Sequence, residues 1–153
     1  MTPQSSRPFE VAPLDNTKEA NLTESGFNDA ATDAVTFKES AIQDLSDMIS
    51  DRDPEILKEL VDAFLGEATR QIQGMLRGIH ANDMSLLFLP AHSLKSSSAT
   101  FGAMRLAILS QLLEDGLTAP RDHRRLGNLV AQIEAEYAKV AVAMLKALAD
   151  WCA

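Results

Sequence analysis

The chain has 153 residues, of which 46% are hydrophobic, and this length suits one domain with a tail rather than two full domains. Its formal net charge of −8 argues against binding nucleic acid, which needs a basic surface, and no run approaches the roughly 20 apolar residues of a membrane-spanning helix. Aromatic residues make up only 5%, while Ala, Leu, Glu and Gln abound, so the composition predicts an all-α fold.

Residues 1–36 contain three prolines and many Ser, Thr, Asn and Asp residues without apolar periodicity, so we predict a disordered tail. The initial methionine and this leader favour a free-standing protein. No secretory signal is visible in residues 1–10, so we expect a cytoplasmic protein. The single cysteine, Cys152, is compatible with a reducing compartment.

Two helices are predicted before the middle of the chain. Residues 37–49 repeat apolar side chains at helical spacing, and Thr36 with Glu39 matches a capping box, which predicts a short lid helix. The next helix is expected to start at Asp53 and Pro54, because aspartate caps the first amides and proline suits the first helical position. It should end near residue 80, and its apolar side should comprise Leu57, Leu60, Val61, Phe64, Ala68, Ile72, Met75 and Ile79.

The third long segment follows a turn at residues 82–83 and carries Pro90. A proline inside a helix lacks an amide donor and clashes with the carbonyl four residues earlier, so we expect a bend at Pro90. The alternative is a helix that starts near Leu89, with residues 84–88 as a separate turn. Either arrangement leaves His92 and Lys95 on one face.

Two further helices complete the predicted fold. One follows Gly102 and ends near Gly116, and the last starts at Asp122 and extends to about residue 150. The apolar side of the last helix should comprise Leu126, Leu129, Val130, Ile133, Tyr137, Val140, Met144 and Leu148. Because long amphipathic helices joined by short connections pack up and down, residues 37–150 are predicted to form an antiparallel four-helix bundle with the additional lid helix.

One stretch, residues 91–103, combines a reactive side chain with a cation and small residues. His92, Lys95, Ser96 and Ala99 are separated by three, four and seven residues, so a helix places them on one face. No bulky neighbour shields the imidazole there. The small side chains let another protein's backbone or a tetrahedral oxyanion approach, and the lysine supplies a point charge suited to phosphate.

This stretch resembles the signature of histidine-containing phosphotransfer domains, His-x-Leu-Lys-Gly-Ser-Ser followed by a glycine, and the resemblance extends over residues 37–148. It implies that His92 is the phosphoacceptor and that Lys95 neutralises phosphate charge. It further implies that Ser97 supplies a hydroxyl near the imidazole and that Glu114, on the neighbouring helix, orients the ring. Ser96 replaces the family's glycine. We expect this small side chain to narrow the access of a partner to the imidazole without blocking it. Phe88, Ser96 and Ala99 are the predicted partner-binding residues.

The resemblance implies a phosphocarrier that relays phosphoryl groups between receiver-domain aspartates in a multistep two-component phosphorelay. An imidazole, with a usual pKa of about 6.5, is largely neutral at pH 7 and can act as the nucleophile. The expected partners are response-regulator receiver domains and a hybrid sensor histidine kinase, with the receiver supplying Mg²⁺. The protein should be a monomer with no cofactor or kinase activity of its own, since no glycine-rich loop could cradle ATP phosphates.

The sequence pattern also admits other functions. The main alternative is an interaction module that binds a receiver or kinase without accepting phosphate. A metal-binding or hydrolytic bundle is disfavoured, because no second histidine or cysteine lies three or four residues after His92. His80 and His123 are interpreted as ordinary solvated side chains. The basic cluster of Arg121, Arg124 and Arg125 is interpreted as a solvated helix start.

Overall fold

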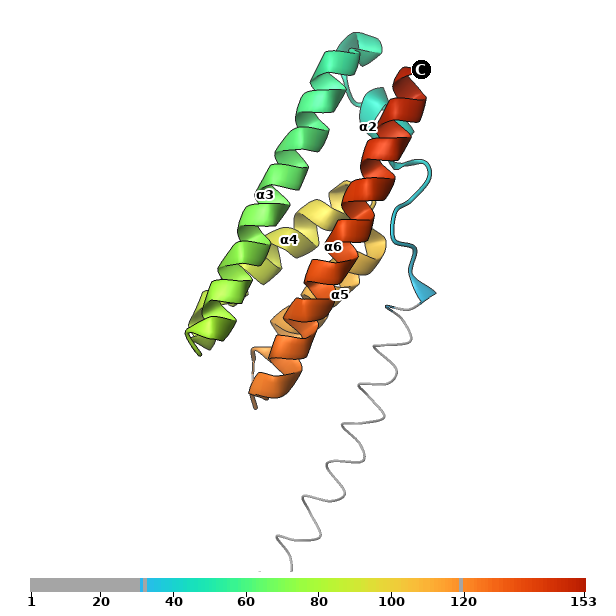
Figure 1. Cartoon of the computed structure of the whole chain (residues 1–153). Helices are drawn as coiled ribbons and strands as arrows, with labels where there is room; N and C mark the ends of the chain where they lie inside the picture. Colours follow the sequence, from blue (N-terminus) through green and yellow to red (C-terminus); the bar gives the residue numbers. More distant parts are fainter. Residues whose placement is uncertain (1–30, 32, 119) are drawn as a thin grey trace, which may run out of the picture. The chain divides into compact units, whose positions relative to one another are not determined.

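The computed structural model describes residues 31, 33–118 and 120–153, and residues 34–153 form one compact unit. Within the described residues the secondary structure is entirely helical, which confirms the all-α prediction. The predicted disordered tail lies outside the described residues at positions 1–30 and 32. The helices are α2 (Ala41–Asp47), α3 (Pro54–His80), α4 (Phe88–Thr100), α5 (Met104–Gly116) and α6 (His123–Cys152), with short 3-10 turns at Ser50–Arg52 and Met84–Leu86 (Figure 1).

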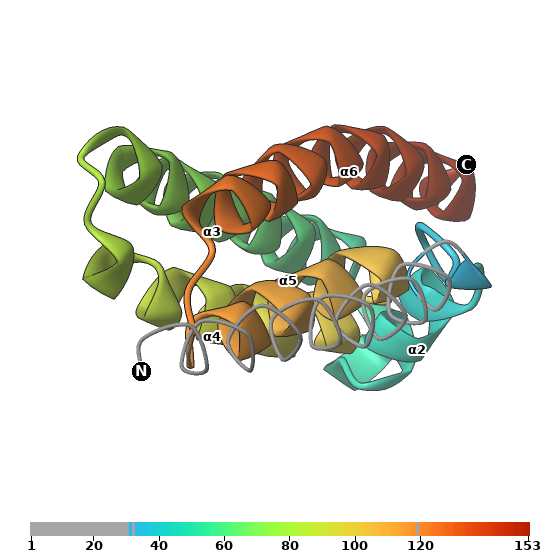
Figure 2. The same cartoon turned by 90° about the horizontal axis from the view of Figure 1, so that it is seen from below.

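The four longer helices enclose the core. α4 packs against α5, α5 against α6, α6 against α3, and α3 against α4. Figure 2 shows α4 and α5 on one side of the unit, with α3 and α6 on the other. The shorter α2 contacts α6 and α3. None of the described helices combines the length and apolarity needed to cross a bilayer.

Aspartate caps fix the starts of the two longest helices. The Asp53 side chain accepts a hydrogen bond from the Glu55 amide at 2.9 Å, and Pro54 occupies the first helical position. At the start of α6, the Asp122 carboxylate accepts hydrogen bonds from the amides of Arg124 and Arg125 at 3.1 and 3.3 Å. Both predicted starts are confirmed, because each cap satisfies amides that have no partner inside the helix.

The predicted apolar sides of α3 and α6 are confirmed with local exceptions. Leu60 and Ile79 are not part of the buried row of α3: Leu60 is exposed and Ile79 is half-buried. Glu136 is an unforeseen buried residue of α6, and one of its carboxylate oxygens lies 3.5 Å from a guanidinium nitrogen of Arg105 on α5. Tyr137 is half-buried, and its hydroxyl donates a hydrogen bond to the Leu65 carbonyl at 2.8 Å.

The predicted lid helix is shorter than expected. α2 starts at Ala41 instead of residue 37, and Ser40 precedes it without a side-chain capping bond, so the Thr36 and Glu39 capping box is wrong. Residues 35–38, called the strap below, form backbone hydrogen bonds with residues that follow α4. The Lys38 amide donates to the carbonyl of Gly102 at 2.8 Å, and the Arg105 amide donates to the carbonyl of residue 35 at 3.0 Å. These long-range backbone bonds take the place of a helical turn.

Gly102 makes the turn between α4 and α5 that the sequence predicts. Its φ of +81° lies in the left-handed region, where glycine has no steric cost. A Cβ atom at this position would lie 2.5 Å from the Cβ of Ala41 and 3.2 Å from that of Lys38. Glycine is therefore needed here both for the backbone conformation and for the close approach of the strap and α2.

Pro90 does not bend a longer helix, so that prediction is wrong and the alternative is correct. The Met84–Leu86 turn is separate, and α4 starts at Phe88 with Leu87 as its N-cap. Pro90 is thus the third residue of α4. Amides in the first turn have no acceptor within the helix, so the missing N–H of proline costs no helical hydrogen bond.

Candidate functional site

α4 presents two different faces. Leu87, which caps the helix, and Ala91, Leu94 and Ser98 within it are fully buried against the other helices. His92 lies on the opposite face, and 54% of its side chain is exposed to solvent. The spacing of three and four residues among the buried positions places them on one side of α4, and His92 lies outside that side. The structure therefore leaves the imidazole accessible.

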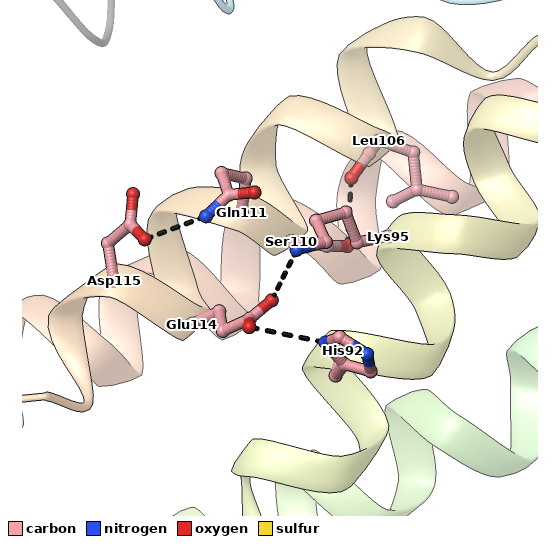
Figure 3. A network of polar contacts seen from close by, with 7 residues as sticks. All are labelled: His92, Lys95, Leu106, Ser110, Gln111, Glu114 and Asp115. Carbon is pink, nitrogen blue, oxygen red and sulfur yellow. Dashed lines mark hydrogen bonds and ion pairs between the residues drawn. The ribbon is translucent and has the colours of Figure 1, made fainter.

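Glu114 of α5 lies between His92 and Lys95 of α4 (Figure 3). One of its carboxylate oxygens, Oε2, is 3.2 Å from Nδ1 of His92, and the other, Oε1, is 2.9 Å from Nζ of Lys95. Glu114 is only 15% exposed, whereas Lys95 is 28% exposed. The antiparallel packing of α4 and α5 brings these three side chains together from positions 22 and 19 residues apart in the sequence.

The carboxylate is electrostatically stabilised. The hydrogen bond from the Lys95 ammonium lowers the pKa of Glu114 below its usual value. Partial burial acts in the opposite direction, while the contact with His92 lowers the pKa further. Glu114 is therefore ionised at neutral pH and can accept a hydrogen bond from Nδ1 of the imidazole.

The structure thus brings together three of the residues singled out in the sequence. Glu114 was placed near His92 by family resemblance, and its contact with Nδ1 agrees with that placement. Its contact with Lys95 was not foreseen. The only sequence signal for it is the spacing of His92 and Lys95 on one side of α4, combined with the antiparallel arrangement of α5. Lys95 is therefore an ion-pair partner of Glu114.

The serines of the motif differ in their surroundings. The Ser97 hydroxyl donates to the backbone carbonyls of Ser93 and Leu94, at 3.1 and 3.4 Å. The structure therefore gives Ser97 partners on its own helix instead of the imidazole. Ser96 and Ala99 are both exposed, on the same side of α4 as His92.

Phe88 lies one helical turn before His92. The two rings stack with centroids 5.8 Å apart and an interplanar angle of 11°. Phe88 is 44% exposed, and Leu86 and Leu89 beside it are exposed as well. This gives an apolar area next to the imidazole.

The remaining candidate residues lie apart from this network. His80 and His123 are exposed, and so are Arg121 and Arg124 in the basic cluster. The Arg121 side chain donates a hydrogen bond to the Leu117 carbonyl at 3.1 Å. Across the part of the chain that the structure describes, no group of three or more His, Cys, Asp or Glu side chains is arranged to hold a metal ion.

Comparison with known proteins identifies the fold and the family. The crystal structure of histidine-containing phosphotransfer protein B from Pseudomonas aeruginosa PAO1 is similar in fold, with a TM-score of 0.62 and 24% sequence identity over 76% of this chain and 97% of that one. No match was found among curated proteins. The family model for the Hpt domain matches residues 59–151, a span that includes α4, α5 and nearly all of α6. Since this match covers more than half of the sequence, the chain belongs to the Hpt domain family.

Proposed function

We propose that this protein is a phosphocarrier of a multistep two-component phosphorelay, in which His92 accepts a phosphoryl group from the aspartyl phosphate of one receiver domain and passes it to an aspartate of another. The observation that carries the proposal is the half-exposed imidazole whose Nδ1 faces an ionised carboxylate. Membership of the Hpt family supports the same function.

The geometry favours Nε2 of His92 as the nucleophile. A carboxylate next to Nδ1 accepts its proton in a hydrogen bond and so favours the tautomer that has its lone pair on Nε2. That lone pair attacks phosphorus, the N–P bond forms, and the P–O bond to the aspartate breaks. The departing aspartate keeps the electron pair of the broken bond. The Nδ1 proton stays on the ring, and Glu114 offsets the positive charge that the ring gains.

In this mechanism the Lys95 ammonium interacts with two anionic groups, the Glu114 carboxylate and the phosphoryl group. It pairs with Glu114 at 2.9 Å, and it lies one turn from His92. A phosphoryl group brings a charge of about −2 next to this ammonium. We assign to Lys95 the neutralisation of part of that charge, while the contact with Glu114 keeps its side chain oriented toward the site.

The partner surface surrounds the imidazole. Phe88, Ser96 and Ala99, extended by Leu86 and Leu89, form an exposed area of apolar and small side chains that we call the docking face. Exposed apolar area of this kind often marks a protein interface. The proposed partners are receiver domains of response regulators and of a hybrid sensor histidine kinase. The receiver brings Mg²⁺ and most of the groups that act on phosphorus.

The proposal includes a finer description of the domain. Residues 37–150 form the phosphotransfer domain, an antiparallel four-helix bundle of α3 to α6 with α2 as a lid. The compact unit of residues 34–153 and the mutual packing of those four helices support this description.

The experiment is incubation with a receiver domain that carries a labelled phosphoryl group. The wild type should gain label, His92→Gln should gain none, and the label should be stable to alkali but labile to acid. His80→Gln is the matched control, because it removes an exposed histidine of α3 and should leave labelling unchanged. Binding of the receiver without any transfer of label would instead favour the interaction module.

A further inference from the structure

The stacked ring of Phe88 suggests a role beyond that of a docking residue. Phe88 is the first residue of α4, and His92 is the fifth. Helical side chains lean toward the N-terminus, so the imidazole lies back over the residue four positions earlier. The 5.8 Å centroid distance and the 11° interplanar angle lie within the range of favourable offset stacking.

The core does not account for this aromatic residue. Leu87, its neighbour, is fully buried and fills the adjoining part of the core, whereas Phe88 is 44% exposed. The contact that the structure records for the Phe88 ring is its stack with His92. The Phe88 ring is thus partly exposed and makes an offset stack with a reactive imidazole, which allows it to act on the orientation of that imidazole.

Phe88 and Glu114 restrain the imidazole in complementary ways. The hydrogen bond to Glu114 lies at one edge of the ring and fixes where Nδ1 points. A single hydrogen bond still allows a half-exposed ring to pivot about it. Stacking against one face removes that freedom. Figure 3 shows the second ring nitrogen directed away from Glu114, which is the orientation that the two contacts together would hold.

We propose that Phe88 is a positioning residue for His92, whose stacked ring holds the imidazole plane so that Nε2 faces the incoming phosphoryl group. This inference rests on the proposed function for its biological purpose, although the positioning can be measured without a partner. The charged groups of the network at the imidazole are Lys95 from α4 and Glu114 from α5.

The test separates positioning from docking by using phosphoramidate, a small-molecule phosphodonor that needs no docking face. Phe88→Leu keeps an apolar side chain but removes the stack, and we expect phosphorylation of His92 by phosphoramidate to slow about three- to tenfold. Phe88→Tyr keeps the ring and should stay within about twofold of wild type. Leu145→Ala, an exposed leucine of α6 outside the docking face, should match wild type with both phosphoramidate and a phosphorylated receiver.

A second readout uses the unphosphorylated protein. Nitrogen-15 NMR of the His92 side chain should show mainly the tautomer protonated at Nδ1 in wild type and Phe88→Tyr, and a larger share of the other tautomer in Phe88→Leu. Equal phosphoramidate rates and equal ring spectra in wild type and Phe88→Leu would overturn the inference, as would a defect confined to the receiver reaction. If wild type accepts phosphate from neither donor, the proposed function fails, and the ring spectra alone still decide whether Phe88 positions His92.

Discussion

The inner and outer faces of α4 contrast sharply. The inner face has Ala91, Leu94 and Ser98, all fully buried, and holds the helix against the core. The outer face carries a half-exposed imidazole, an ion pair and a stacked aromatic ring. The two sets alternate within the same 13 residues. The comparison indicates that the inner face determines stability, while the outer face can be devoted to chemistry at little cost in folding.

The largest effect on stability is expected from the inner face. Leu94→Ala removes a fully buried side chain and should lower the free energy of unfolding by about 2 to 5 kcal/mol, because a cavity replaces its contacts. Leu89→Ala, an exposed leucine of the same helix, should change it by less than about 0.5 kcal/mol. Urea unfolding followed by circular dichroism measures both. Equal losses for the two variants would break the distinction between the faces.

The next largest effect is expected at the turn that joins α4 to α5. Gly102→Ala should cost about 1 to 3 kcal/mol of unfolding free energy, since the residue has positive φ and its new Cβ would collide with Ala41. Gly127→Ala is the matched control: it lies within α6 with open space around it, and it should gain up to about 1 kcal/mol. Thermal unfolding compares the pair. A Gly102→Ala variant as stable as wild type would contradict this prediction, because the strap and α2 would then move to make room for the Cβ at no cost in stability.

Substitutions on the outer face of α4 should change the rate of phosphoryl transfer more than the stability of the fold. Lys95→Ala should slow transfer from a phosphorylated receiver about tenfold, because one charge contact to the phosphoryl group is lost. Its free energy of unfolding should fall by no more than about 1 kcal/mol. Lys146→Ala removes a comparable ion pair on α6, with Asp150 at 3.0 Å, and should leave the rate unchanged. Quench-flow kinetics decide the matter, and an unaltered rate in Lys95→Ala would contradict its assigned role.

The smallest effect concerns the pH dependence of stability. Because the pKa of Glu114 is lowered in the folded protein, its stabilising contribution is complete above the usual glutamate pKa of about 4.3 and is lost as the pH falls through the lower folded-state value. Glu114→Gln should therefore be less stable than wild type at pH 7, by at most about 1 kcal/mol, and the difference should shrink below pH 4. Urea unfolding at several pH values measures it.

The control for this pH prediction is Glu67→Gln. Glu67 pairs with Arg70 at 2.9 Å on the exposed surface of α3, where water screens the interaction. Its stability difference from wild type at pH 7 should be small. A Glu114→Gln difference that stays constant from pH 7 to pH 3 would show that the pairing with Lys95 and His92 contributes nothing to folding.

Local signals predict the parts of the fold that depend on neighbouring residues. Asp53 with Pro54, and Asp122, mark the starts of α3 and α6 because an aspartate cap acts within three residues of its position. The start of α2 could not be predicted in this way. The strap before it bonds to Gly102 and Arg105, more than 60 residues later, and such pairing overrides a local capping pattern.

The contacts of the site can likewise be separated into those that local sequence spacing predicts and those that depend on how the helices pack. His92 and Lys95 are separated by three residues, so their common face follows from helical spacing alone. The contact of Glu114 with both side chains depends on how α4 and α5 align, which no local pattern contains. The stack of Phe88 on His92 has the spacing of one helical turn, yet only coordinates show that the two rings lie nearly parallel.

The most direct measurement of the central claim is phosphorus NMR of the receiver-phosphorylated protein, labelled with nitrogen-15 in histidine. We expect one phosphorus signal coupled to a single ring nitrogen, Nε2 of His92, and we expect this signal to be lost in His92→Gln. A phosphoryl group attached to a serine oxygen, a carboxylate or Nδ1, or no phosphoryl group at all, would contradict it.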